Sequence, residues 1–208
     1  MRVRKHANPF NFRKQSDKLQ IKKLFTDPAK PLYLEIGFAQ GEFLLKMAQT
    51  QTNINFLGME VRKPLVDKIN ELIIKNNLAN ICMLHESSTV NLHILPENSI
   101  DKVFIFFPDP CFKKKHHKRR IITPAFLTEI SSKLKADNEI LFQTDVKELF
   151  EDTKTYIAEQ QNYKILSAKK EIATINETGI PSYFEQRCLD NGWPIYRIKF
   201  CFLKTNRN

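Results

Sequence analysis

Phe106–Arg120 is the segment whose residue types suggest chemistry most directly. It reads Phe-Phe-Pro-Asp-Pro-Cys-Phe, followed at once by Lys-Lys-Lys-His-His-Lys-Arg-Arg. The prolines on either side of Asp109 restrict the backbone and so hold this carboxylate in one place. A carboxylate can accept hydrogen bonds from the N1–H and 2-amino groups of a guanine, while nearby cations bind the flanking phosphates. Asp109 is therefore the candidate group that orients a guanine. The candidate RNA phosphate contacts are Lys114, Lys115, His116, Lys118, Arg119 and Arg120.

A second set of candidates consists of acids that follow short apolar runs. Glu35 and Glu60 each lie at the end of such a run, and Gly37 and Gly41 lie in the loop between them. Glycines let a backbone approach a ligand closely, and an acid that ends the second strand can accept hydrogen bonds from ribose hydroxyls. The spacing is not G-x-G-x-x-G, so the loop favours an adenosine ligand with a cationic amino-acid part over a diphosphate. Glu86, after a third apolar run, is expected near the adenine. The candidate cofactor-binding residues from this pattern are Glu35, Gly37, Gly41, Glu60, Glu86 and Ser87.

Apolar periodicity predicts the elements that position these residues. A helix is expected from about Ser16 to Phe25, with Ser16 as its cap. Expected strands cover residues 31–36, 54–59, 81–84, 103–107, 139–144, 163–168 and 195–203. Expected helices cover residues 42–51, 63–76, 124–134 and 146–160. Alternation of strands and helices predicts a largely parallel sheet that is covered on both faces.

Charge is concentrated in two places. Lys and Arg number 33 and Asp and Glu number 23, so the net charge is +10. Residues 1–23 contain eight bases and one acid, and residues 113–120 contain six bases and no acid. The remaining chain is mildly acidic, so the two basic segments predict a polyanionic partner. We expect residues 1–25 to form a basic arm and helix, and residues 26–208 to form a single domain.

Composition excludes several classes of protein. No apolar run is long enough to cross a bilayer, and the first residues have no apolar signal region, so a cytoplasmic location without membrane contact is expected. The four cysteines form no C-x-x-C pair, which argues against a zinc finger or a disulfide framework. His116 and His117 have no further Cys/His cluster beside them. We therefore expect no metal site and no required protein partner.

The combined motifs point to a known family. FFPDP with KKKHHKRR, together with LEIGFAQGEFL upstream and FQTD at 142–145, resembles the bacterial tRNA (guanine-N7)-methyltransferases. The resemblance covers roughly residues 30 to 202. It implies a class I methyltransferase fold, α/β and Rossmann-like, with a mostly parallel seven-stranded sheet, helices on both faces and an antiparallel C-terminal strand. It also implies S-adenosyl-L-methionine as cofactor and tRNA as partner, with methylation of guanine 46 in the variable loop.

The resemblance assigns roles residue by residue. Asp109 matches the family's catalytic residue, which also contacts the cofactor, and Glu35, Glu60 and Glu86 match its cofactor acids. The residues that match its substrate contacts are Lys113, Asp145, Ser182, Tyr183, Phe184 and Glu185. The chain departs from the family at Ala39, where a glycine is usual, and we expect this alanine to be tolerated if its φ is negative. It also has Cys111-Phe112 where the family has Trp-Pro, which alters the pocket shape.

The expected chemistry needs little machinery. Guanine N7 carries a lone pair and no proton, so it needs no general base, and positioning should supply most of the acceleration. Asp109 would orient the guanine and Asp145 would assist.

The sequence leaves three alternative functions open. The first is a pyrimidine C5-methyltransferase with Cys111 as its nucleophile. The second is an NAD-dependent oxidoreductase, and the third is a non-catalytic RNA-binding module.

Overall fold

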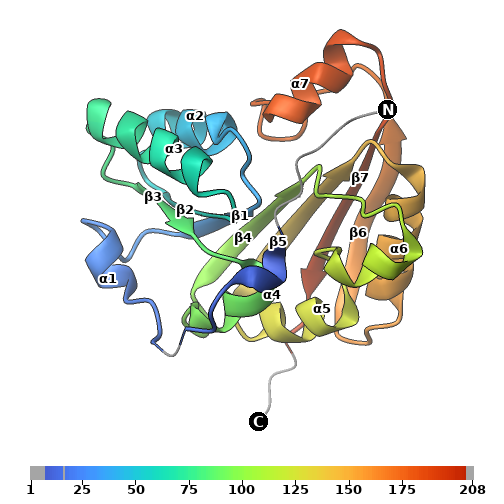
Figure 1. Cartoon of the computed structure of the whole chain (residues 1–208), viewed down its shortest axis with the longest axis horizontal. Helices are drawn as coiled ribbons and strands as arrows, with labels where there is room; N and C mark the ends of the chain where they lie inside the picture. Colours follow the sequence, from blue (N-terminus) through green and yellow to red (C-terminus); the bar gives the residue numbers. More distant parts are fainter. Residues whose placement is uncertain (1–7, 16, 205–208) are drawn as a thin grey trace.

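The structure is a computed structural model that describes residues 8–15 and 17–204. Its centre is a seven-stranded sheet in the order β3-β2-β1-β4-β5-β7-β6, with β7 antiparallel to both of its neighbours (Figure 1). The strands are β1 Leu32–Ile36, β2 Asn55–Glu60, β3 Ile81–His85, β4 Ile100–Phe106, β5 Leu134–Thr144, β6 Tyr163–Glu171 and β7 Ile195–Phe202. This arrangement confirms the predicted mixed sheet with an antiparallel C-terminal strand.

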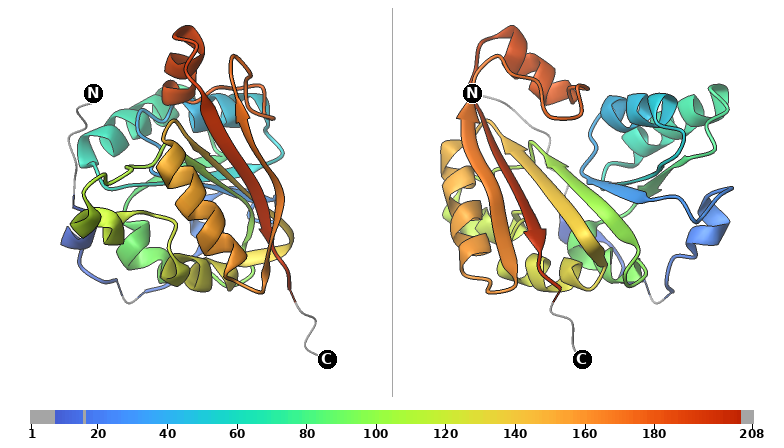
Figure 2. Two further views of the ribbon diagram at one scale, coloured as in Figure 1. Left: turned by 90° about the vertical axis from the view of Figure 1, so that its right-hand side faces the viewer. Right: turned by 180° about the vertical axis from the view of Figure 1, so that it is seen from behind.

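Helices cover both faces of the sheet, as predicted. Helices α2 and α3 pack on one face, while α5 and α6 pack on the other (Figures 1 and 2). The α-helices are α1 Ile21–Leu24, α2 Glu42–Thr50, α3 Lys63–Lys75, α4 Ser88–Asn91, α5 Pro124–Ser131, α6 Lys147–Ala158 and α7 Tyr183–Asp190. The 3-10 helices are η1 Pro9–Asn11, η2 Leu92–Ile94 and η3 Lys114–Arg119. Within the described ranges, none of these helices has the length and apolar character that crossing a membrane requires.

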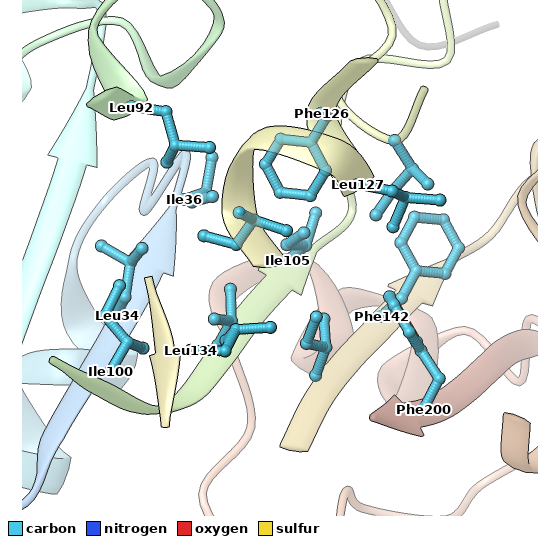
Figure 3. Packing of buried hydrophobic residues seen from close by; sticks show 14 of the residues in the cluster. Leu34, Ile36, Leu92, Ile100, Ile105, Phe126, Leu127, Leu134, Phe142 and Phe200 are labelled. Atoms are coloured by element: carbon cyan, nitrogen blue, oxygen red, sulfur yellow. The ribbon is translucent and has the colours of Figure 1, made fainter. Parts of the chain in front are cut away.

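Strand β4 is almost continuously apolar because both of its faces are buried. Val103 and Ile105 point into the cluster under α5 and α6, whereas Phe104 and Phe106 point into the cluster under α2 and α3. Figure 3 shows the first of these clusters, in which Ile105 lies among side chains from neighbouring strands and from α5. A central parallel strand is buried on both faces, so both alternating sets of side chains are apolar. The strand can therefore deliver the segment after Phe106 to a fixed place.

Several boundaries differ from the sequence prediction. The helix expected to reach residue 134 ends at Ser131, and β5 begins at Leu134, because Leu134 pairs with Ile100 of β4. The helix expected from Ser16 to Phe25 is only the single turn α1, and Ser16 itself lies outside the described residues. Helix α7 was not predicted. Its sequence signal is a capping box, in which Ser182 accepts from the Glu185 backbone and Glu185 reaches back to Ser182.

Candidate active site

The candidate residues gather where the parallel strands end. Because β1, β2, β4 and β5 run in one direction, the loops that follow them meet at the same edge of the sheet. Helix α7 lies at this edge, next to the start of β7 (Figure 2). A pocket here has the Gly37–Gly41 loop on one side and Ser182–Phe184 on the other, with Glu35 and Phe106 also in its lining.

Glu35 is a buried carboxylate that lacks a full set of hydrogen bonds. Its side chain is 3% exposed, and among the described residues none hydrogen-bonds its Oε2 atom. Burial, together with the negative charge of Glu60, raises the pKa of Glu35 from 4.5 to about 8. An unpaired buried carboxylate is costly, so a cationic ligand group beside it would be strongly favoured.

Glu60 connects the glycine loop to the start of α3. Its Oε2 atom accepts from the Ala39 backbone N–H at 3.1 Å and from Arg62 Nη2 at 2.9 Å. Its Oε1 atom accepts from the Arg62 backbone N–H and from Arg62 Nε. The bonds to Glu60 hold the pKa of Arg62 above its ordinary value. Ribose hydroxyls at Glu60 would therefore share or replace the contacts that Arg62 makes.

The glycine loop is wound tightly against α3. Gly41 has a φ of 70°, and a Cβ atom there would lie 2.6 Å from Cγ1 of Ile69, so only glycine fits. Ala39 has a φ of 50°. The condition under which the alanine was expected to be tolerated, a negative φ, is therefore not met. The left-handed conformation points the Ala39 N–H at Glu60, and it costs an L-residue about 1–2 kcal/mol.

Glu86 and Ser87 lie after β3, further along the same edge. Glu86 accepts hydrogen bonds from Asn91 Nδ2 at 2.7 Å and from Gln15 Nε2 at 3.2 Å. Asn91 also donates to the backbone carbonyl of Arg13, so the N-terminal segment packs against this end of the sheet. Ser87 is completely buried, and its Oγ atom has no hydrogen-bond partner within the described part of the chain. A buried hydroxyl in this state would gain a hydrogen bond from a polar ligand group that reached it.

The turn that carries Asp109 starts with a strained residue. Phe107 has a φ of 50°, is 3% exposed, and donates its backbone N–H to the Gln143 carbonyl at 2.7 Å. A bulky residue with positive φ is rare and is found where surrounding structure enforces it. This kink turns the chain out of β4. Asp109 is half-buried just beyond it, and its Oδ1 atom accepts from the Cys111 backbone N–H at 3.0 Å.

Cys111 faces inward rather than into solvent. It has a φ of 48° and is 9% exposed, whereas Phe112 after it is 58% exposed. Burial raises the pKa of the Cys111 thiol to about 11, with a further contribution from the Asp109 carboxylate. A thiol with this pKa is almost entirely protonated at neutral pH and is a poor nucleophile.

The basic segment divides into exposed and buried cations. Lys113, Lys115 and Lys118 are exposed, His116 and Arg119 are half-buried, and the side chain of Lys114 lies outside the described part. Arg120 is different, because it is 2% exposed and bonds to the Pro110 carbonyl, Glu148 and Asp152. Its guanidinium would have to leave these buried partners to reach a phosphate. We therefore remove Arg120 from the candidate phosphate contacts.

Ser182 and Glu185 form the base of α7. Glu185 is completely buried, and its two oxygens accept from the backbone and side chain of Asn176, from Arg197 Nη2 and from the Ser182 backbone N–H. Four hydrogen bonds fill the acceptor positions of a carboxylate. Glu185 therefore fixes α7 in place and has no remaining position for a guanine, so we remove it from the candidate substrate contacts.

Tyr183 and Phe184, two further candidate substrate residues, line the pocket together with Ser182. Phe184 packs against Phe107 with ring centroids 6.4 Å apart, and Tyr183 is 41% exposed. Asp145 is half-buried directly after β5. Sequence reasoning assigned no role to Gln143, which is 1% exposed and whose Oε1 atom lacks a hydrogen bond within the described residues. The signal that could have found it is a polar side chain inside an otherwise apolar strand end.

Comparison with known proteins decides the family. A family model described as "Putative methyltransferase" matches residues 29–198. The tRNA (guanine-N(7)-)-methyltransferase of Synechococcus sp. (strain JA-3-3Ab) is 35% identical over 199 residues, covering 94% of this chain and 84% of the relative. The chain belongs to the tRNA (guanine-N7)-methyltransferase family.

Other relatives extend the comparison. The family member from Ureaplasma urealyticum serovar 10 is 32% identical over 223 residues, covering 99% of this chain and all of the relative. A 16S rRNA (adenine(1408)-N(1))-methyltransferase from Catenulisporales acidiphilia, solved with the cosubstrate SAM, superposes with a TM-score of 0.67 at 9% identity. That alignment covers 94% of this chain and 96% of the other. At this identity the likeness shows the fold, which is that of the class I methyltransferases.

Proposed function

We propose that the protein transfers a methyl group from S-adenosyl-L-methionine to N7 of guanine 46 in the variable loop of tRNA, in the cytoplasm. The observation that carries the proposal is the adjacency of two loops. The glycine loop follows β1, which contains Glu35, and the Asp109 turn follows β4, and these two strands pair directly. A cofactor site and a guanine-orienting carboxylate would therefore share one edge of the sheet, next to the exposed cations of residues 113–119.

The residues present fit S-adenosyl-L-methionine. The buried Oε2 of Glu35 and the buried Oγ of Ser87 lack hydrogen bonds within the described residues, which suits a ligand with polar groups at both ends. Glu35 would hold the cationic amino group, Glu60 the ribose, and Glu86 with Ser87 the adenine. When bound, the cofactor supplies a methyl group on a positively charged sulfur. The acidic pocket favours that positive charge.

Asp109 would act by orientation. Guanine N7 needs no deprotonation, so the protein's task is to present the base edge at the correct angle and distance. Asp109 would accept hydrogen bonds from the guanine edge, and the backbone of its turn is fixed by two prolines and by the Phe107 hydrogen bond to Gln143. Lys113, Lys115 and neighbouring cations would hold the flanking phosphates. Asp145, at the end of β5, would assist.

The alternatives have less support. A pyrimidine C5-methyltransferase needs a thiolate, whereas burial raises the pKa of Cys111 to about 11. A nicotinamide-dependent oxidoreductase would need a pyrophosphate cradle, and the loop Gly37–Gly41 lacks that spacing. A non-catalytic RNA-binding module gives no reason for the buried Oε2 atom of Glu35, which has no hydrogen-bond partner among the described residues.

The deciding experiment maps the methylated atom. Unmodified tRNA is incubated with the protein and the methyl donor, and N7-methylguanosine is then located by borohydride–aniline cleavage. We expect strand cleavage at guanine 46, and we expect the Cys111→Ser variant to give the same product. Methylation of a pyrimidine, or loss of activity in a well-folded Cys111→Ser variant, would overturn the proposal. Cleavage at another guanine would overturn only the assignment of position 46.

A further inference from the structure

Arg120 joins the Asp109 turn and η3, which follow one another in the sequence, to the distant helix α6. Its Nε atom donates to the carbonyl of Pro110, in the turn that carries Asp109, at 2.8 Å. Its Nη2 atom contacts His117 Nε2 in η3 at 3.1 Å. The guanidinium also donates to Glu148 and Asp152, which are one turn apart on α6. Apart from the contact to His117, Arg120 therefore donates only to oxygens that belong to the Asp109 turn or to α6.

The shape of this cluster explains why an arginine is needed. A ring nitrogen of His117 and one carboxylate oxygen each of Glu148 and Asp152 lie within 4.8 Å of one another. The Arg120 guanidinium contacts all three of these side chains. A planar guanidinium can donate in several fixed directions at once, whereas a lysine ammonium is a compact charge without this fork. The Arg120 side chain is 1% exposed, while that of Glu148 is 56% exposed. The cluster thus buries its cation and leaves one of its acids in solvent.

We propose that Arg120 is a positioning residue, whose guanidinium fastens the Asp109 turn and the basic helix η3 to the acidic side chains of α6. It sets the orientation of the guanine-binding carboxylate relative to the exposed phosphate-binding cations. The inference deepens the proposed function and rests on it for the identity of the substrate. It differs from the role that the basic sequence suggests, because a phosphate-binding Arg120 would work without Glu148 and Asp152.

That difference gives the test. In the double variant Glu148→Gln, Asp152→Asn, two acids near the RNA-binding surface are removed and Arg120 is kept. Greater positive charge strengthens RNA binding in general. If Arg120 binds a phosphate, the double variant should methylate tRNA as well as or better than the wild type. If Arg120 positions the turn, we expect kcat to fall at least tenfold, with the dissociation constant for S-adenosyl-L-methionine changed less than twofold.

Hydrogen exchange provides a readout that does not depend on activity. We expect faster amide exchange over residues 108–120 in the double variant and in Arg120→Lys, which keeps the charge but loses the fork. The matched control is Lys133→Met. Lys133 is also a buried cation paired with an exposed acid, with side-chain exposures of 4% for Lys133 and 55% for Glu97, but it precedes β5 at the opposite edge of the sheet. Its loss should lower the melting temperature without changing kcat or exchange over residues 108–120.

The outcomes separate this inference from the proposed function. Unchanged exchange over residues 108–120 in the double variant, or unchanged kcat, would overturn the role of Arg120 even if the wild type methylates guanine N7. Absence of N7-methylguanosine with the wild type would overturn the proposed function, while the exchange experiment would still test the anchoring. If Arg120→Lys fails to fold, the double variant decides the question, because its buried arginine is retained.

Discussion

The acids at the ends of β1 and β2 and the basic segment after β4 lie at the same edge of the sheet, yet their charges are buried to different degrees. Glu35 and Glu60 are each 3% exposed, whereas Lys113 and Lys115 stand in solvent. A carboxylate without water binds a small cation strongly, because the local dielectric constant is low. Exposed lysines bind a polynucleotide through long-range attraction and counterion release. The difference teaches that burial, as well as sign, separates a small-molecule site from an RNA-binding surface.

The same two regions share one device. Ala39 in the glycine loop beside these acids, and Phe107 and Cys111 in the turn after β4, all adopt positive φ without being glycine. Each of these residues uses its backbone N–H in a hydrogen bond, to Glu60, to Gln143 or to Asp109. Such conformations persist only where the surroundings enforce them. Both regions therefore exchange some stability for a defined backbone direction.

The largest effect is expected from Asp109→Ala. If Asp109 orients the guanine, its loss should lower kcat by about 10²-fold or more, because misplacement of a reacting atom by about 1 Å has that effect. Binding of S-adenosyl-L-methionine, measured by calorimetry, should persist. The control is Asp67→Ala, which removes an exposed acid from α3. Normal turnover by Asp109→Ala would remove the basis for assigning guanine recognition to the turn.

Glu35→Gln should have the next largest effect, on the cofactor. Loss of a charged hydrogen bond costs about 1.5–3 kcal/mol, which corresponds to a roughly ten- to hundredfold larger dissociation constant for S-adenosyl-L-methionine. Glu42→Gln, an exposed acid that lines the same pocket, is the matched control and should change affinity little. Equal affinities of the two variants for S-adenosyl-L-methionine, measured by calorimetry, would show that the buried Glu35 contributes no more to cofactor binding than the exposed Glu42.

The pKa of Glu35 gives this comparison a pH dependence. Burial raises that pKa to about 8, so the carboxyl is largely protonated at neutral pH in the protein without ligand. The ratio of wild-type to Glu35→Gln affinity should rise from pH 6 to pH 9, because only the ionised form attracts the amino group.

The same raised pKa makes the folding stability change in the opposite direction, so that stability falls as the pH rises. The favourable contribution of neutral Glu35 is complete below pH 4.5 and is lost as pH rises through about 8, so wild type should lose more stability than Glu35→Gln over that range.

A smaller effect is expected from Lys115→Gln on the basic side of the comparison. Loss of one phosphate contact should reduce the slope of log affinity against log salt concentration by about 0.9. Lys164→Gln makes the same change of charge at the start of β6, on the opposite edge of the sheet, and should leave the slope unaltered. Filter binding of tRNA across a salt series measures both slopes. Identical slopes for Lys115→Gln and wild type would argue that this lysine does not touch RNA.

The smallest effect concerns the strained loop. Ala39→Gly should relieve about 1–2 kcal/mol of left-handed strain, while glycine's greater freedom in the unfolded chain opposes this by about 0.4–1 kcal/mol. We therefore expect a net stabilisation of roughly 0.5 kcal/mol by denaturant unfolding. Ala125→Gly, in helix α5, should instead destabilise by about 1 kcal/mol. Destabilisation by Ala39→Gly would mean that the methyl group contributes packing that outweighs the strain.

The sequence predicts the sheet well because its strands follow a local rule. The run around Phe104 is apolar on both faces, and Glu35 and Glu60 mark where two strands end, so a largely parallel sheet with acids at one edge could be predicted, although the order of its strands could not. Helix α7 could not be recognised from apolar periodicity, since it is short and polar. Its capping box at Ser182 and Glu185 was interpreted as a substrate motif instead.

The role of individual charges depends on partners that are distant in the sequence. Arg120 belongs to a uniform basic run, and it is buried because it pairs with Glu148 and Asp152 on α6. These two acids are far from Arg120 in the sequence, so the pairing could not be predicted from the sequence. Glu185 is similar, because Arg197 and Asn176 saturate it. The sign of φ at Ala39 likewise depends on Glu60, a residue in the next strand. Sequence patterns give the type and place of such residues but not their tertiary partners.

The reversed direction of β7 has a practical consequence. Strand β7 begins near α7 and ends at the opposite edge of the sheet (Figure 1). Its first residue, Ile195, pairs with Glu171, and its last, Phe202, pairs with Tyr163. The chain therefore departs from the sheet on the side remote from the pocket and from the lysines after Asp109. A fluorophore or surface tether attached at the exposed Leu203, just after β7, would leave the approach of a large ribonucleic acid to the pocket unobstructed, which suits immobilised binding measurements.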